Sequence, residues 1–414
     1  MHFHSESKEK IGLIVREVAT QWVSCAHINE GLKLAYENAS NVQVFELYTK
    51  NSHETVNRII DSQINCLVFL DHQVRPLEIL RNNDLIRAIK TRGIRVIFHI
   101  YGCFVDRLVE FHTLLTLLED QDVHFVAASP KQKLLAEYSF ILPEGSVHCI
   151  PFPVKEVQAE IYPKQSDLRN LLGLPAQGRI FLYTGRISTY KNVELVMSLI
   201  AEIRKSNKDL FFVYVGQFDQ FDSFLANDKI SNQAIINAKI LNHIDPNSEW
   251  CFYRAHVPER ELSNYYQAAD AFVSLSTCRG EDFGMSVLEA SSYGLPCFLT
   301  DWGGYSGFSA LSQTYLAPVS FEKDDINISM ATLSKKISSF VPSHFEERKE
   351  KNKQVLSMFG QKETTVRIKE LLTCKKANPI GVKKDLLMER HFLKKAKSWE
   401  IFMKMKGLYE FYAS

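Results

Sequence analysis

Short apolar segments alternate with stretches of helical spacing along most of this chain. In the first part, six segments are β-branched and mostly apolar on both faces, which is typical of buried parallel strands. They span residues 11–15, 42–47, 66–70, 95–100, 124–129 and 147–152. The alternation predicts an α/β domain whose doubly wound parallel sheet is covered by helices on both sides.

A second series of apolar segments follows the polar stretch 156–170, and it spans residues 181–185, 210–217, 250–255, 268–276 and 297–300. A chain of 414 residues also exceeds the roughly 100–200 residues of one domain. We therefore expect two Rossmann-like domains that face one another across a cleft, residues 1–158 and 159–376. A helical tail, residues 377–414, follows them. Ligands of such sheets bind at the carboxyl ends of the strands.

The segment from Thr277 to Pro296 is the most informative for chemistry. A buried strand ends before it, helical spacing begins near Gly284, and Gly294 with Pro296 ends the helix. The start of such a helix attracts anions, phosphates above all, and a glycine there lets the backbone approach a ligand. Glu281 and Glu289 either bind ligand hydroxyls or are ordinary solvated charges, and the residues alone leave both interpretations open.

A second motif lies in residues 181–203, which predict a strand, a turn at Gly185 and a long amphipathic helix. Arg186 and Lys191 bracket the turn. Cations are disfavoured at a helix start, so their presence there favours a role in binding. Hydrogen bonds between such cations and a diphosphate contribute roughly 1.5–3 kcal/mol each.

Charge and cysteine content exclude several classes of protein. Lys and Arg total 49 against 48 Asp and Glu, so the chain has no basic surface of the kind that binds nucleic acid. The eight cysteines are scattered without a Cys-x-x-Cys pair, which predicts reduced thiols in a cytoplasmic protein. We expect no signal peptide and no membrane span. The His and Asp residues lack metal-ligand spacing, so neither a metal nor a cofactor is expected.

The string EDFGMSVLEASSYGLPCFLTDWGG, which begins at Glu281, resembles the carboxylate-pair signature of retaining glycosyltransferases with the GT-B fold. In this family-4-like group (glycosyl transferases group 1), two glutamates are separated by seven residues. A Phe-Gly pair lies between them, and Gly-x-Pro follows. The resemblance implies a hexosyltransferase that moves a sugar from a nucleoside-diphosphate sugar to a hydroxyl of a glycan, lipid-linked saccharide or protein. A catalytically inactive GT-B partner protein and a nucleotide-sugar epimerase are the alternatives.

The resemblance also implies roles for particular residues. The first domain would bind the acceptor and the second the nucleotide sugar. Arg186 and Lys191 would grip the diphosphate, Glu281 the sugar hydroxyls and Glu289 the ribose hydroxyls, with His99 near the sugar as a further catalytic residue. Further donor-binding residues are expected at Gly185, Gly216, His256, Val257, Asp282, Phe283, Gly284 and Met285. Gly216 is equally interpreted as a plain turn glycine, and His99 as a buried core histidine.

Three segments leave questions open. Residues 16–24 lack the glycines that relatives carry in the first loop, and Arg254-Ala255 stand where a glycine is common. The Gly303-Gly304 pair either admits the donor sugar or forms a turn. The tail 383–414 mixes lysines with large apolar residues. We expect it to pack back on the first domain, the alternative being a surface for peripheral membrane contact.

Overall fold

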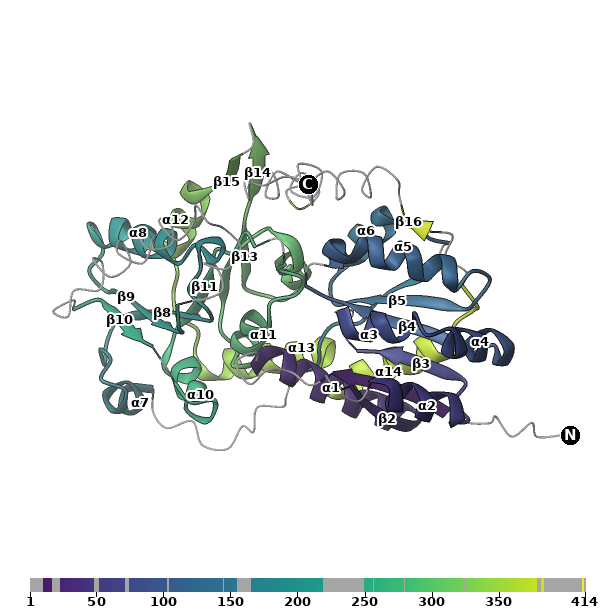
Figure 1. The fold of residues 1–414 in the computed structure, drawn as a ribbon. Helices are drawn as coiled ribbons and strands as arrows, with labels where there is room; N and C mark the ends of the chain where they lie inside the picture. The colour runs from purple at the N-terminus through teal and green to yellow at the C-terminus, as the bar shows by residue number, and fades with distance from the viewer. Residues whose placement is uncertain are drawn as a thin grey trace, which may run out of the picture. The chain divides into compact units, whose positions relative to one another are not determined.

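The structure is a computed structural model of the 414-residue chain. It describes residues 10–16, 23–47, 52–70, 74–102, 104–143, 145–154, 165–218, 249–255, 257–278, 280–322, 325–377, 381–382 and 412. The chain forms two compact units, residues 1–155 with 359–395 and residues 156–358 with 396–414 (Figure 1). None of the described helices is long and apolar enough to cross a membrane.

The first unit is built on a parallel sheet whose strand order is β2-β1-β3-β4-β5-β7. The phenylalanines Phe69, Phe98 and Phe125 occupy paired positions on three neighbouring strands, and their rings stack with centroids 5.1 and 5.6 Å apart. Such stacking fixes the register of the buried strands, because a slip by one residue would turn every side chain to the other face. The strands are β1 (Lys10–Arg16), β2 (Asn41–Leu47), β3 (Cys66–Phe69), β4 (Arg95–Ile100), β5 (Val123–Ala127) and β7 (Val147–Cys149).

Helices fill the connections of the first unit, as the alternation predicted. Asn82 caps one of them with its side chain, and Gly93 ends the same helix in the left-handed conformation. A small antiparallel pair, β6 (Phe140–Ile141) with β16 (Gly381–Val382), was not predicted, since two residues carry no periodicity. The helices are α1 (Val23–Ala39), α2 (Ser52–Asp61), α3 (Val74–Ile79), α4 (Asn83–Arg92), α5 (Leu108–Leu117), α6 (Pro130–Ser139) and α14 (Gln361–Thr373), with the 3-10 turn η1 (Phe104–Arg107).

The second unit has a parallel sheet of order β10-β9-β8-β11-β12-β13. Connections run outward in both directions from the middle pair, β8 and β11, which is the point where ligands of open α/β sheets bind. The strands are β8 (Arg179–Thr184), β9 (Leu210–Val215), β10 (Cys251–Arg254), β11 (Ala271–Ser274), β12 (Cys297–Thr300) and β13 (Thr314–Ala317), with the antiparallel pair β14 (Val319–Glu322) and β15 (Asp325–Ile328). The helices are α7 (Gln165–Leu171), α8 (Val193–Arg204), α10 (Glu259–Ala268), α11 (Met285–Ser292), α12 (Met330–Ser338) and α13 (Phe345–Phe359), with the 3-10 turns η2 (Thr189–Lys191) and η4 (Gly303–Phe308).

The predicted fold class, two Rossmann-like α/β units, is confirmed, although some bounds differ. The apolar run 268–276 contains the strand β11 but also the end of α10 and a buried loop, because burial alone does not distinguish these three states.

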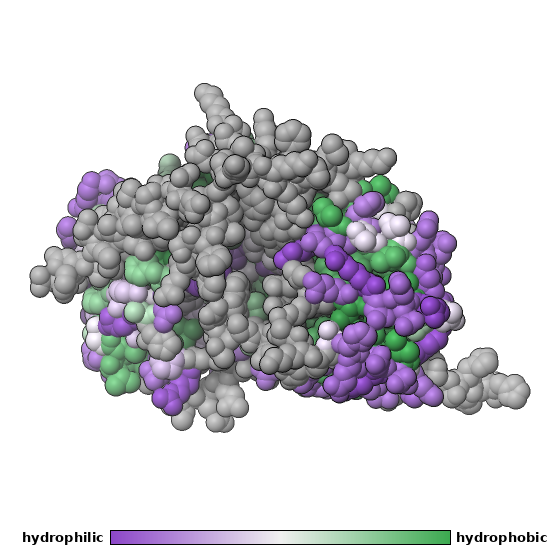
Figure 2. All heavy atoms as spheres, in the orientation of Figure 1, coloured by the Kyte–Doolittle hydropathy of each residue, from purple (hydrophilic) through white to green (hydrophobic). Residues whose placement is uncertain are grey.

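A buried ion pair between Arg169 and Asp270 at 2.7 Å joins α7 to the start of β11. On the face of the molecule in Figure 2, the described surface of the first unit is mainly hydrophilic, with apolar groups among the polar ones.

The chain returns to the first unit earlier than the expected boundary at residue 376. The Val154 amide donates to the carbonyl of Phe359 at 2.8 Å, and α14 then packs against α1. Of the tail beyond residue 382, Tyr412 alone lies within the described residues. It is buried, with its ring centroid 5.4 Å from that of Trp302 in the second unit. The other tail residues, on which the membrane interpretation depends, lie outside the described part of the chain.

Candidate functional site

The loops that follow β8 and β11 carry the motif residues of the second unit. The two strands are neighbours, with Ala271 paired to Phe181, so their carboxyl ends lie side by side. The Asn192 side chain donates to the carbonyl of Leu275 at 2.7 Å and to the Thr277 hydroxyl at 2.9 Å. These hydrogen bonds join the two loops at the point where the strand order reverses.

Lys191 and Glu281 form an ion pair between the two loops. The Glu281 side chain is 8% exposed and the Lys191 side chain 20%. Burial by itself would lower the pKa of Lys191, but the Glu281 carboxylate, together with Tyr305, raises that pKa above its usual value. Lys191 is therefore charged at neutral pH, and its ammonium lies against the Glu281 carboxylate within the site.

The Gly303-Gly304 pair supports the backbone of the Glu281 loop. The Gly304 amide donates to the carbonyl of Glu281 at 2.7 Å. A β-carbon at Gly303 would overlap that same carbonyl, and one at Gly304 would overlap the backbone of Asp282 and Phe283. The structure thus assigns this pair to close backbone packing in a turn, one of the two interpretations left open by the sequence.

Gly284 marks the start of α11, as the sequence predicts. It has φ of 105°, and a β-carbon there would lie 2.6 Å from the Tyr305 ring. The Tyr305 hydroxyl lies 2.8 Å from Ser274 Oγ at the end of β11. Glycine is needed at 284 both for its conformation and for the close approach of Tyr305.

Glu289 lies on α11 and accepts a hydrogen bond from the Tyr266 hydroxyl at 2.8 Å. The same hydroxyl lies 2.7 Å from Thr184 Oγ1, at the end of β8. The Tyr266 ring stacks on Tyr293 with centroids 5.2 Å apart. Tyr266 therefore links Glu289 to the carboxyl end of β8, the strand that precedes Lys191.

The glycines after β8 and β9 bring two further loops together. A β-carbon at Gly216 would overlap the carbonyl of Gly185. The Ile187 amide donates to the backbone carbonyl of Gln217 at 2.8 Å. Gly216 therefore serves backbone packing, whatever it contacts in a complex. The exposed Arg186 follows Gly185, and its carbonyl accepts from the Tyr183 hydroxyl at 2.7 Å.

The remaining predicted donor-binding residues differ in exposure. Phe283 is buried against Phe308, with ring centroids 5.1 Å apart, so its side chain belongs to the interior of the unit. Asp282, Met285 and Val257 are half-buried. His256 lies outside the described residues.

Sequence reasoning missed the polar side chains that hold these residues in place. Asn192, Tyr266 and Tyr305 position the loops and the two glutamates through the contacts given above. The position of Asn192 directly after Lys191 was a signal that could have been used. The two tyrosines had none, because they lie in segments that also fit an ordinary core.

His99 lies in the first unit and is 2% exposed. Its Nε2 lies 2.8 Å from the hydroxyl of Tyr36 on α1, and the two rings meet edge to face. Burial lowers the pKa of His99 to about 3, so the imidazole is neutral at physiological pH. These contacts match the interpretation of His99 as a satisfied core histidine.

The pKa of His99 predicts how stability changes with pH. The unfolded chain protonates this histidine below about pH 6.5, whereas the folded unit keeps it neutral down to about pH 3. Stability is therefore lost as pH falls, by about 2 kcal/mol between pH 7 and pH 5. Urea unfolding at the two pH values should show that His99→Gln lacks this decrease in the free energy of unfolding. The control His53→Gln, at an exposed histidine, should show the same decrease as the wild type. Equal pH dependence of stability in the two variants would contradict the assignment.

Comparison with known proteins finds a family match in the second unit. Residues 164–336 match the family described as glycosyl transferases group 1. The lipopolysaccharide 1,2-N-acetylglucosaminetransferase of Salmonella typhimurium is 26% identical over 256 residues, 60% of this chain and 61% of that protein. The mannosylfructose-phosphate synthase of Agrobacterium fabrum is 27% identical over 217 residues, 50% of this chain and 43% of that protein. The chain thus spans less than two thirds of the length of these relatives.

Solved structures extend the likeness to both units. Anabaena HepE in complex with UDP aligns with a TM-score of 0.62 at 12% identity, over 88% of this chain and 99% of that one. A glycosyltransferase from Rickettsia africae aligns with a TM-score of 0.61 at 14% identity, over 89% of this chain and 100% of that one. At such identities the likeness concerns the fold. The chain therefore has the GT-B fold, and residues 164–336 of its second unit match the glycosyl transferases group 1.

Proposed function

We propose that the chain is a retaining glycosyltransferase that moves a hexose from a nucleoside-diphosphate sugar to a hydroxyl acceptor. The observation that carries the proposal is the Lys191–Glu281 ion pair at the reversal point of the family-matched sheet, with Glu289 linked through Tyr266 to the end of β8. A cation for phosphate and carboxylates for hydroxyls thereby lie in the segments that follow the neighbouring strands β8 and β11. Nucleotide sugars present these two kinds of group within one molecule.

The diphosphate of the donor would exchange partners with the existing ion pair. Lys191 would turn from Glu281 to the phosphate oxygens, joined by Arg186 and the backbone amides at the start of α11. Glu281, released from Lys191, would accept hydrogen bonds from the sugar hydroxyls. Because one charge pair replaces another, Lys191 stays neutralised throughout binding.

Glu289 would hold the ribose of the donor. Tyr266 orients its carboxylate through the 2.8 Å hydrogen bond. A carboxylate accepts several hydrogen bonds, so the vicinal hydroxyls of a ribose would be its partners in the complex. Glu281 and Glu289 would thus contact the two ends of one donor, with the diphosphate between them. In this arrangement each carboxylate faces hydroxyl groups and not the phosphate, which limits the electrostatic repulsion between the carboxylates and the diphosphate.

In the reaction, the bond between the anomeric carbon and the leaving phosphate oxygen breaks, and the acceptor oxygen bonds to that carbon on the same face. The acceptor proton passes to the leaving phosphate. Negative charge grows on the diphosphate, where Lys191 and Arg186 would stabilise it more strongly than in the ground state. These cations do the work that a divalent metal does in other transferases, so we propose that transfer needs no metal.

The proposal is tested first by binding. A panel of nucleotide sugars is screened by thermal unfolding, since a ligand bound only by the native state raises the melting temperature. Uridine diphosphate sugars come first, because HepE was solved with UDP-glucose and an Escherichia coli trehalose-6-phosphate protein with UDP-2-fluoro glucose. At 100 times the Kd, the expected stabilisation is about 2.7 kcal/mol.

Turnover is then measured with the donor that binds. Release of nucleoside diphosphate should depend on an added hydroxyl acceptor, and NMR of the product should show the anomeric configuration of the donor. Added Mg²⁺ or Mn²⁺ should leave the rate unchanged. Binding without any release would indicate a non-catalytic partner protein, and isomerisation of the donor sugar an epimerase. Either result would overturn the proposal.

A further inference from the structure

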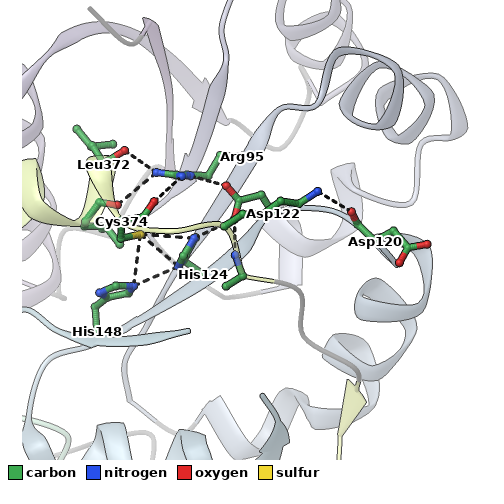
Figure 3. A network of polar contacts seen from close by, with 10 residues as sticks. Arg95, Asp120, Asp122, His124, His148, Leu372 and Cys374 are labelled. Atoms are coloured by element: carbon green, nitrogen blue, oxygen red, sulfur yellow. Dashed lines mark hydrogen bonds and ion pairs between the residues drawn. The ribbon is translucent and has the colours of Figure 1, made fainter. Parts of the chain in front are cut away.

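Three side chains with metal-binding atoms converge in the first unit (Figure 3). His124 lies on β5, His148 on the neighbouring strand β7, and Cys374 directly after α14. One ligand atom from each lies within 4.8 Å of the others. The cluster lies in the first unit, whereas the proposed sugar transfer uses Lys191, Glu281 and Glu289 of the second unit, so that transfer does not involve the cluster.

The separations of these atoms fit the corners of a tetrahedral site. His124 Nδ1 lies 3.1 Å from His148 Nε2, and Cys374 Sγ lies 3.7 Å from the first and 3.9 Å from the second. Zinc bonds nitrogen at about 2.0–2.1 Å and thiolate sulfur at about 2.3 Å. Tetrahedral angles then place two nitrogens about 3.3 Å apart, and nitrogen and sulfur about 3.6 Å apart. The three separations therefore lie within a few tenths of an ångström of those in a tetrahedral zinc site.

A carboxylate fixes the orientation of His124. Its Nε2 lies 3.0 Å from Asp122 Oδ1, and Asp122 in turn accepts from Arg95 at 2.7 Å and from the Ala377 amide at 2.8 Å. Since a carboxylate at neutral pH only accepts, Nε2 carries the proton of that hydrogen bond. The lone pair of Nδ1 is then available toward His148 Nε2, 3.1 Å away. Cys374 Sγ lies 3.7 Å from Nδ1 and 3.6 Å from Nε2 of the same ring, so the imidazole must turn for Nδ1 and the thiolate to share one ion. Carboxylate–histidine–metal chains of this kind orient the ligands of zinc sites.

We propose that His124, His148 and Cys374 bind one zinc ion, with water in the fourth position. One thiolate and two imidazoles are a donor set that suits this borderline-soft cation, whereas Mg²⁺ and Ca²⁺ prefer oxygen. Cys374 and His148 are half-buried, so water can reach the open position.

The ion would attach the C-terminal end of α14 to the strands β5 and β7. The Arg95 guanidinium already donates to the carbonyls of Leu372 and Cys374, two acceptors left unpaired at the end of that helix. A metal bond to Cys374 would add a second attachment of the helix end to β5 and β7. Because the three ligands come from sequence positions 124, 148 and 374, the site exists only in the folded unit, and the ion stabilises that fold.

The test uses the full chain, stripped of metal and reduced. One equivalent of Co²⁺, a spectroscopic substitute for zinc, should give the intense thiolate-to-metal absorption band and visible bands typical of tetrahedral cobalt. One equivalent of Zn²⁺ should displace it and raise the melting temperature by several degrees. Absence of the thiolate band in the wild-type chain, or an unchanged melting temperature with Zn²⁺, would overturn the proposal.

Variants locate the site. Cys374→Ser should lose the thiolate band and the zinc-dependent rise in melting temperature, and His148→Gln should weaken cobalt binding at least about tenfold. Cys25→Ser, at a half-buried cysteine on α1, is the matched control and should keep both signals. Circular dichroism of each metal-free variant checks that it folds. A thiolate band that persists in Cys374→Ser, or disappears in Cys25→Ser, would assign the metal elsewhere.

Discussion

The variant Lys191→Met should lose both sugar transfer and several kcal/mol of stability, and only the stability should return when Glu281→Gln is added. Removing the lysine leaves the Glu281 carboxylate, 8% exposed, without its cation. Breaking a buried ion pair in this way costs about 3–5 kcal/mol. Loss of a charge that stabilises the leaving diphosphate lowers kcat by at least about 10²-fold.

The double variant separates the two effects. Methionine with neutral glutamine leaves no uncompensated charge, so the unfolding midpoint in urea should move back toward the wild-type value. Transfer should stay absent, because neither the phosphate cation nor the carboxylate is restored. Lys205→Met is the control for charge loss alone. Its partner Glu202 is 67% exposed, and the change in stability should stay within about 0.5 kcal/mol. A Lys191→Met enzyme with wild-type turnover would refute the proposed role.

The second large effect is expected for Gly303→Ala. Gly303 has φ of 53°, where alanine costs about 1–2 kcal/mol, and its new β-carbon would also overlap the Glu281 carbonyl. The loop must move to relieve the overlap, which displaces Glu281. We expect a total loss of more than about 3 kcal/mol. A shift of about 1 Å in a catalytic group can lower kcat/KM about 10²-fold.

Gly93→Ala is the matched control for conformation without overlap. Gly93 has φ of 62°, and no described atom lies within 4 Å of the position that a β-carbon would take there. Urea unfolding should show only the conformational cost, about 1–2 kcal/mol, and kcat/KM should be unchanged. If the two variants lose equal stability and activity, the close approach at Gly303 has no special effect.

The fold and the motif residues followed from local sequence patterns. Apolar strands and helical spacing predicted both sheets, and the confirmed resemblance to glycosyl transferases group 1 depended on the string that begins at Glu281. Gly284 was correctly placed at the start of a helix because glycine and the following periodicity are local signals. Such features need no knowledge of distant residues.

Contacts between distant segments could not be predicted. The motifs indicated separate roles for Lys191 and Glu281, but their pairing depends on how two loops 90 residues apart approach each other. The hydrogen bond between His99 and Tyr36 likewise joins residues 63 positions apart, so the sequence could not show it. The expectation that no metal binds rested on ligand spacing along the chain. Cys374 lies 250 residues from His124, so spacing could not reveal that cluster.

The discontinuity of the first unit has a consequence for biosynthesis. This unit contains the earliest residues of the chain, yet α14 packs on α1, and Gln361 donates to the carbonyl of Gly31 at 3.0 Å. The residues of α14 leave the ribosome only after the whole sheet of the second unit has been translated. Until then α14 cannot cover α1, so the apolar side of that helix stays exposed while the second unit is synthesised. During this interval the nascent chain is open to aggregation and to chaperone binding.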